Sequence, residues 1–296
     1  MRVFTILTKA FILLFLTITF SSGCEKKNDP DLIPSYLRVE KIGLTSTFEQ
    51  GTTSHKITDA WVYLDETLIG VFELPATVPI LTEGEQKITI RPGIKINGIA
   101  NTRTIYPFFT DMKQTIVLVR DSVVNFSDTI TTYSENTVFP WIENFDFSGI
   151  TLDTTSNSTV AINKINDPDQ IFHYPGENNS SSAFITMTND TSVFESISTQ
   201  KYDFPNDGTA IFLELNFKTN HPLVVGVFYT AASIRVQRPL LILNKTDQWN
   251  KIYVNLTVPV YDTPSARDFQ VFFGAQKEDG TEEAKIYLDN IKLVHF

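Results

Sequence analysis

The stretch Ala210-Ile-Phe-Leu-Glu-Leu-Asn-Phe217 shows how the chain is built, because apolar side chains recur at every second residue along it. Successive side chains of a β-strand point to opposite faces of a sheet. One face carries Ile211, Leu213, Leu215 and Phe217. The other carries Phe212, Glu214, Asn216 and Lys218. We therefore predict a strand with one face in a hydrophobic core and a second face of polar and aromatic residues.

The same alternation, or short runs of β-branched and aromatic residues, recurs along the chain. Such segments are 37–42, 60–64, 86–90, 115–119, 223–229, 249–256 and 268–275. Turn residues separate them at short intervals, and no run after the N-terminal segment has a helical period. The sequence therefore predicts an all-β fold made of β-sandwiches.

A change in composition divides this β-rich region in two. No Lys or Arg occurs between Asp121 and Lys164, and the segment 127–136 is rich in Ser and Thr. We predict a small β-sandwich over residues 36–120, a linker over 121–138 and a jelly-roll β-sandwich over 139–296. Both parts have ordinary domain sizes.

Residues 1–23 are typical of an export signal. Arg2 and Lys9 give it a positive start, an apolar run follows over 10–20, and small residues precede Cys24. The apolar run is shorter than the roughly 20 residues that a membrane-spanning helix needs. Residues 24–35 are polar, contain two prolines and have no periodicity, which is typical of a tether.

The small residues directly before Cys24 resemble the lipobox of bacterial lipoproteins, in the looser form of Bacteroidetes-type proteins, since Ser21 stands where an aliphatic residue is usual. The resemblance implies cleavage before Cys24 and acylation of its sulfur. We therefore expect a protein held by lipid in the cell envelope, at the outer membrane of a Gram-negative bacterium. The alternative is a secreted protein with an incidental cysteine.

Composition excludes several classes of function. Cys24 is the single cysteine, so the chain has no internal disulfide and no thiolate metal site. A net charge of -10 argues against a nucleic-acid partner. The four histidines are scattered, and no catalytic motif is present. We expect a noncatalytic protein, although paired carboxylates of a glycoside hydrolase stay open, because such partners meet only in the folded chain.

The first domain has a recognisable order of strands and turns. Residues 60–64 and 67–70 are predicted strands joined by a tight turn at Asp65-Glu66. A proline-restricted segment follows over 74–79, and residues 83–90 form another strand. This order resembles PEGA-type surface domains. Tyr106-Pro-Phe-Phe109 adds an aromatic cluster that we expect in a core.

The second domain opens with Phe139-Pro-Trp-Ile-Glu143 and closes with Tyr287-Leu-Asp-Asn-Ile291. Together with the Trp249 to Tyr253 strand, these segments resemble the jelly rolls of galactose-binding-like carbohydrate-binding modules. The last strand ends within two residues of the C-terminus, which suggests a structural strand that pairs beside the first. The resemblance implies a structural calcium site at Glu143 and Asp289, with backbone carbonyls completing an oxygen shell.

Aromatic and polar side chains on the faces away from the core suggest a ligand site. Sugar rings stack on aromatic side chains, while planar polar groups bond their hydroxyls. The predicted ligand-binding residues are Glu214, Asn216, Tyr229, Tyr253, Asn255 and Phe272. We expect a noncatalytic module that binds an extracellular ligand such as a glycan. The alternative is a structural or assembly component of the envelope that contacts another protein through its jelly roll.

Overall fold

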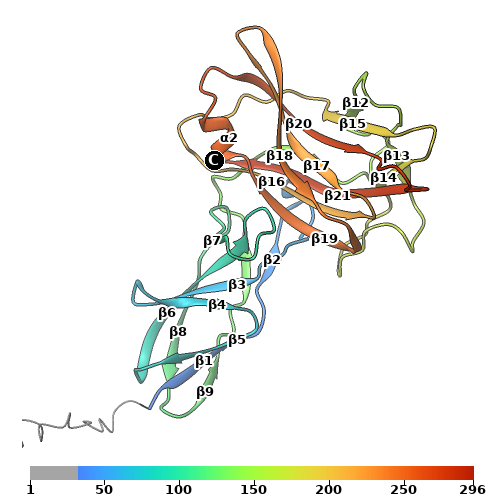
Figure 1. Cartoon of the computed structure of the whole chain (residues 1–296). Coiled ribbons are helices and arrows are strands. Elements are labelled where there is room, and N and C mark those ends of the chain that lie inside the picture. The colour runs from blue at the N-terminus through green and yellow to red at the C-terminus, as the bar shows by residue number, and fades with distance from the viewer. Residues whose placement is uncertain (1–32) are drawn as a thin grey trace, which may run out of the picture.

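The computed structural model describes residues 33–296, which form two all-β domains joined into one elongated body (Figure 1). The export signal, Cys24 and most of the tether lie outside the described residues. The described chain starts at the end of the first domain that is farthest from the second domain (Figure 1). None of the helices within residues 33–296 has the length and apolar character needed to cross a membrane.

The first domain consists of two sheets and a small ribbon. Its strands are β1 (Ser35–Val39), β2 (Gly43–Thr45), β3 (Asp59–Leu64), β4 (Thr67–Glu73), β5 (Ala76–Ile80), β6 (Gly84–Lys95), β7 (Arg103–Ile105), β8 (Met112–Leu118), β9 (Val123–Asn125) and β10 (Ile130–Thr132). One sheet has the order β5-β1-β9, and the other has the order β4-β3-β6-β7, with β8 also paired to β6. Strands β3 and β4 are joined by Asp65 and Glu66, which both have positive φ, so the predicted tight turn is confirmed.

The segment predicted as a linker, residues 121–138, contains two of these strands. Strand β9 pairs in parallel with β1, and β10 pairs in parallel with β2, with Ile130 opposite Gly43. The prediction of a linker is therefore wrong over these residues. The prediction relied on the Ser- and Thr-rich composition, but threonine occurs in short edge strands as well as in loops. The β-branched residues Val123, Val124 and Ile130 supply the strand propensity of this segment.

The second domain is a β-sandwich of two facing sheets. Its elements are β11 (Val138–Glu143), β12 (Leu152–Thr154), β13 (Asn163–Ile165), β14 (Ser182–Met187), β15 (Val193–Ser198), β16 (Ile211–Thr219), β17 (Leu223–Ala231), β18 (Ile234–Leu243), β19 (Thr246–Asn255), α2 (Thr257–Tyr261), β20 (Arg267–Gln276) and β21 (Ala284–His295). One sheet has the order β13-β14-β21-β16-β19, and β11 pairs with β21, so the prediction that the first and last strands are neighbours is confirmed. The other sheet has the order β12-β15-β20-β17-β18. Its inward side chains and those of the first sheet form one hydrophobic core.

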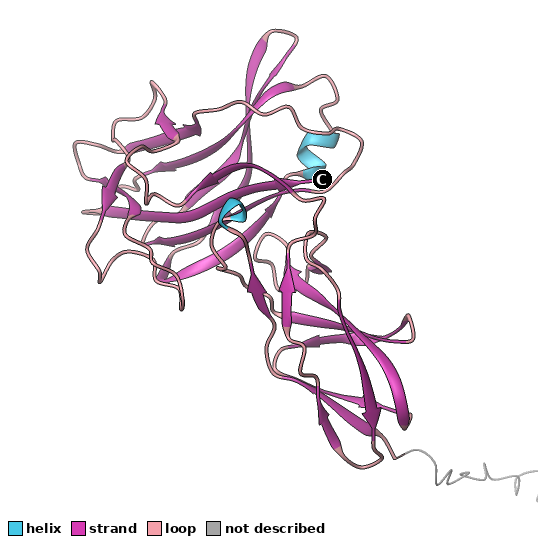
Figure 2. Ribbon diagram, turned by 180° about the vertical axis from the view of Figure 1, so that it is seen from behind, coloured by secondary structure: helices cyan, strands magenta, loops and turns pink. Residues whose placement is uncertain are grey.

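Strand β16 is buried on both faces, although its sequence alternates. The predicted inner residues lie in the sandwich core. The opposite face meets the first domain, and Phe212 belongs to a separate cluster of buried residues between the domains. Figure 2 shows from behind how the first domain meets the sandwich, and the short helix η1 (Phe48–Gln50) lies near β11.

Aromatic side chains from both domains fill the contact between them. The buried residues of this inter-domain cluster, six of them aromatic, are Leu44, Ile94, Tyr106, Phe108, Phe109, Tyr133, Phe212, Tyr253 and Val294. The Phe108 ring lies 4.7 Å from the ring of Phe296 and 6.1 Å from that of Phe212, measured between centroids. The expectation that residues 106–109 are core residues is confirmed, and this core belongs to both domains.

Replacing Phe108 by alanine tests how far this shared core stabilises the protein. We expect Phe108→Ala to lower the free energy of unfolding by about 3–5 kcal/mol, because it empties a fully buried ring position. Urea unfolding followed by tryptophan fluorescence measures this loss. Phe48→Ala is the matched control, since Phe48 is 86% exposed, and it should change stability by about 0.5 kcal/mol or less. Equal losses in the two variants would contradict a shared core.

Candidate functional site

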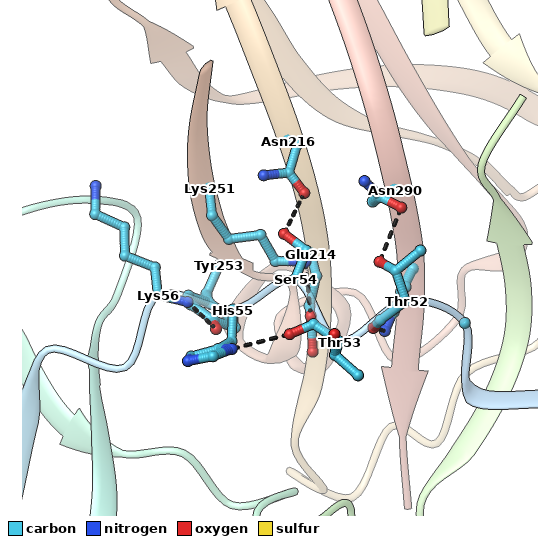
Figure 3. A network of polar contacts seen from close by, with 12 residues as sticks. Thr52, Thr53, Ser54, His55, Lys56, Glu214, Asn216, Lys251, Tyr253 and Asn290 are labelled. Atoms are coloured by element: carbon cyan, nitrogen blue, oxygen red, sulfur yellow. Dashed lines mark hydrogen bonds and ion pairs between the residues drawn. The ribbon is translucent and has the colours of Figure 1, made fainter. Parts of the chain in front are cut away.

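Five consecutive residues of the first domain, Thr52–Lys56, cross the sandwich at the domain junction, and we call them the strap (Figure 3). Each of the five makes a hydrogen bond to a residue of the second domain. The pairs are Thr52 with Asn290, Thr53 with Glu177, Ser54 with Asn216, His55 with Tyr174 and Lys56 with Tyr253. The strap therefore fixes the first domain to the sandwich by side-chain contacts along its whole length.

The carboxylate of Glu214 lies under the strap and has no solvent exposure. The hydroxyl of Tyr106 donates to its Oε1 at 2.8 Å, and that of Tyr133 donates to the same atom at 3.0 Å. The Nζ atom of Lys251 lies 3.1 Å from Oε2. Burial alone would raise the pKa of Glu214, but the charges of Lys251 and Lys292 outweigh it and hold the pKa below its ordinary value.

A second buried lysine, Lys292, closes this network. Its Nζ atom donates to the backbone carbonyl of Thr52 in the strap and lies 3.4 Å from the Tyr133 hydroxyl. Burial lowers the pKa of Lys292 to about 7, although the charge of Glu214 acts in the opposite direction. The junction thus contains a buried carboxylate between two lysines, and one of these lysines titrates near neutral pH.

Four of the six predicted ligand-binding residues belong to this junction. Glu214, Asn216 and Tyr253 are buried. Asn255 is half-buried, and its backbone N–H donates to the side chain of Asn97 in the first domain. The expectation that these four point away from the sandwich core is confirmed, but the expectation that they line an exposed site is wrong. Alternation predicts which face of a strand a residue occupies and does not predict what covers that face.

The other two predicted residues lie apart from these and from each other. Tyr229 packs against the sandwich core, with its ring 5.7 Å from that of Phe269, so its predicted outward orientation is wrong. Alternation counted from Leu223 keeps Tyr229 on the inner face, and Phe228 is the aromatic residue that faces outward. Phe272 lies on the outer face of the second sheet, with its ring 5.2 Å from that of Phe228. It is only 1% exposed, so the expectation that it lines an exposed site is wrong for Phe272 as well.

The outer face of the second sheet, away from the first domain, is a separate candidate site, which we call the open face. The ring of Phe272 packs closely against Gly226. A Cβ atom added at Gly226 would lie 2.4 Å from this ring. A hydrogen bond of 2.8 Å joins Gln237 on β18 to Glu195 on β15. Strands β20 and β17 lie between β15 and β18 in this sheet. The side chains of Glu195 and Gln237 can meet across two intervening strands only if the sheet curves toward them, so the open face is concave.

Planar polar side chains are held in place on the open face. The carboxylate of Glu195 accepts hydrogen bonds from Thr155 and Asn157 as well as from Gln237. The guanidinium of Arg235 donates to Gln270 at 2.6 Å and lies 4.8 Å from the centroid of the Phe228 ring. Of the six predicted ligand-binding residues, only Phe272 lies on this face. The period-2 pattern that places Phe228 beside it was available in the sequence, but the contact between β15 and β18 was not.

The predicted calcium ligands lie on paired strands, yet their oxygens are already occupied. Glu143 accepts hydrogen bonds from the backbone N–H groups of Phe145 and Thr151, and Asp289 accepts from Ser182 and the backbone N–H of Asn290. Burial raises the pKa of Asp289 well above its ordinary value, and the nearby charge of Glu143 adds to this effect. Within residues 33–296, no group of three or more His, Cys, Asp or Glu side chains could hold a metal ion. These residues therefore do not fit a resident calcium ion.

The described chain is thus a two-domain all-β protein with a concave polar and aromatic face on its larger β-sandwich. No protein-family model and no curated protein matches it. Solved structures with a similar chain trace include a family 29 carbohydrate-binding module complexed with mannohexaose, at a TM-score of 0.33 and 12% identity over 54% of this chain and 92% of that chain.

Two further structures extend this comparison. A family 11 carbohydrate-binding module from Clostridium thermocellum, in complex with a mixed-linked tetrasaccharide, has a TM-score of 0.32 and 13% identity over 53% of this chain and 94% of that chain. The enzymatically active domain of bacteriophage CBA120 tailspike protein 4 has a TM-score of 0.35 and 15% identity over 49% of this chain, which spans 19% of the tailspike chain. At these values, none of the likenesses decides what this chain binds.

The titration of Lys292 can be measured through stability. The pKa of this lysine is about 7 in the fold, whereas an ordinary lysine has a pKa of 10.5. Between these two pH values the unfolded chain therefore binds a proton that the folded chain lacks. The free energy of unfolding therefore rises with pH across this window and falls as the pH drops toward 7. We expect Lys292→Met to reduce this slope by up to about 1.4 kcal/mol per pH unit.

Urea unfolding at about pH 7.5, 8.5 and 9.5 gives the slope for the wild-type chain and the variant. This interval lies below the range in which ordinary tyrosines ionise, at about pH 10. Lys41→Met is the matched control, because Lys41 is exposed, and its slope should equal that of the wild-type chain. Equal slopes for Lys292→Met and the wild-type chain would contradict the assignment.

Proposed function

We propose that this protein is a lipid-anchored component of the bacterial cell envelope whose sandwich domain binds a glycan on its open face. The observation that carries the proposal is the arrangement of the exposed Arg235 and Gln237 side chains beside the half-buried ring of Phe228 on a concave face. Fixed amide, guanidinium and carboxylate groups can bond pairs of sugar hydroxyls without losing further side-chain entropy. Arg235 and Glu195 carry opposite charges, so the face suits a neutral glycan.

The geometry of the whole chain supports this use of the open face. The first domain covers the opposite sheet of the sandwich, and the hydrogen bonds of Glu195 and Arg235 on the open face are made within the sandwich domain. The described chain begins at the far end of the first domain (Figure 1). An anchor at Cys24 would then hold the first domain near the membrane and place the sandwich farther out.

Binding at the open face can be tested with a glycan array and titration calorimetry. We expect the chain from residue 25 onward to bind one class of neutral glycan, and Arg235→Ala and Gln237→Ala each to weaken that binding about tenfold, because each removes fixed hydrogen bonds. The whole mature chain is needed, because a sandwich expressed alone would expose the charged network around Glu214 to solvent.

Arg38→Ala provides the matched control for the loss of an arginine. Arg38 is exposed in the first domain and pairs with Glu40, so its loss should leave glycan binding unchanged. If no glycan binds, or if all three variants lose binding equally, the open face is not a glycan site. In that case the alternative, an assembly component that contacts another envelope protein, becomes the better description.

The anchor has its own test. We expect the full chain expressed in a Gram-negative host to incorporate labelled palmitate, and Cys24→Ala to abolish the label, because Cys24 is the sole thiol that could carry the lipid. Membrane fractionation should show the variant released from the membrane. Label that persists in Cys24→Ala would rule out this anchor.

A further inference from the structure

A second surface hollow, which the proposed glycan site does not use, lies beside the strap at the domain junction. It is a cleft of about 640 Å³ formed by three segments of the chain. Residues 46–53 supply one wall, the loop after β11 supplies a second, and the loop 176–179 supplies a third. The cleft therefore exists only where the two domains meet, and it lies apart from the open face.

Two exposed phenyl rings belong to this cleft. Phe48 is 86% exposed and Phe147 is 64% exposed, and both line the cleft. Exposed apolar side chains that gather at one place, unlike those scattered singly, mark interaction sites. A ring face attracts a cation held within about 6 Å of its centroid, most often an arginine guanidinium.

Three side chains of the cleft offer hydrogen-bond acceptors. The Oδ1 atom of Asn179 is buried and has no hydrogen-bond partner. Asp146 and Glu177 each use one carboxylate oxygen to hold the cleft wall, Asp146 through Ser180 and Glu177 through Thr53. Their second oxygens have no hydrogen-bond partner among residues 33–296. A buried unpaired acceptor costs free energy that a donating ligand would recover.

The charge of the cleft is negative. Glu49, Asp146 and Glu177 line it, and none of its lining residues is basic. Two lysines lie just outside the lining. Lys164 donates to the backbone carbonyl of Phe147, and Lys292 lies behind Gly51, where burial lowers its pKa to about 7. The net charge of -10 on the whole chain adds a long-range attraction for cations.

We propose that this cleft binds a basic peptide segment, with an arginine or lysine side chain of a partner protein inserted between Phe48 and Phe147. The inserted cation would lie against the phenyl rings and donate to Asn179 and to the free carboxylate oxygens. This site would make the protein an adaptor, with a protein partner at the domain junction and the glycan at the open face.

The test uses a blocked tetra-arginine peptide and the same peptide with citrulline, which has the shape of arginine without its charge. Titration calorimetry with the chain from residue 25 onward should show the arginine peptide binding at least tenfold more tightly. We expect Phe48→Ala, Phe147→Ala and Glu49→Gln each to weaken its binding about three- to tenfold. All three side chains are exposed, so the fold should tolerate these changes.

Glu282→Gln is the matched control for charge, since it removes one exposed carboxylate outside the cleft and should leave binding unchanged. No binding of the arginine peptide, equal binding of the citrulline peptide, or equal weakening by Glu282→Gln would overturn the proposal. Arg235→Ala should leave peptide binding intact, so a failure of the glycan site and a failure of this cleft give different patterns. Binding of a neutral glycan that Phe48→Ala abolishes would replace the basic peptide with a sugar as the ligand.

Discussion

The buried carboxylate of Glu214 is the constraint on which the arrangement of the two domains depends. A charge without solvent exposure is tolerated only when other groups replace its hydration. Here these groups come from both domains, since Tyr106 and Tyr133 belong to the first part of the chain and Lys251 to the sandwich. Separating the domains would leave Glu214 with only part of its partners, so the network favours one relative orientation.

That fixed orientation determines which surfaces remain available. The sheet with strands β16, β19 and β21 is covered by the first domain and the strap, so its polar residues are structural. The open face of the opposite sheet and the cleft beside the strap are the surfaces left for partners. A flexible linker would have left the sheet with β16, β19 and β21 uncovered and would not have held the walls of the cleft together, whereas β9, β10 and the strap fix the two domains.

Much of the fold could be predicted from local sequence. Period-2 alternation correctly assigned Glu214 and Phe272 to the outer faces of their strands, and the turn at Asp65 and Glu66 was recognised from residue types. The candidate site was predicted less well. Tyr253 looks like a sugar-stacking residue in the sequence, yet its hydroxyl accepts a hydrogen bond from the backbone of Lys56 in the other domain. Sequence patterns report side-chain direction, and they contain no information on long-range partners.

The sequence by itself determined the all-β class and the alternation of faces along the strands. The tertiary structure alone decided which outer face is covered, which is concave and where Phe48 and Phe147 share a cleft. The physical reason is that strand periodicity arises between neighbours in the chain. The contacts of Glu214 with Tyr106, or of Glu195 with Gln237, join residues far apart in the chain and depend on how whole sheets pack.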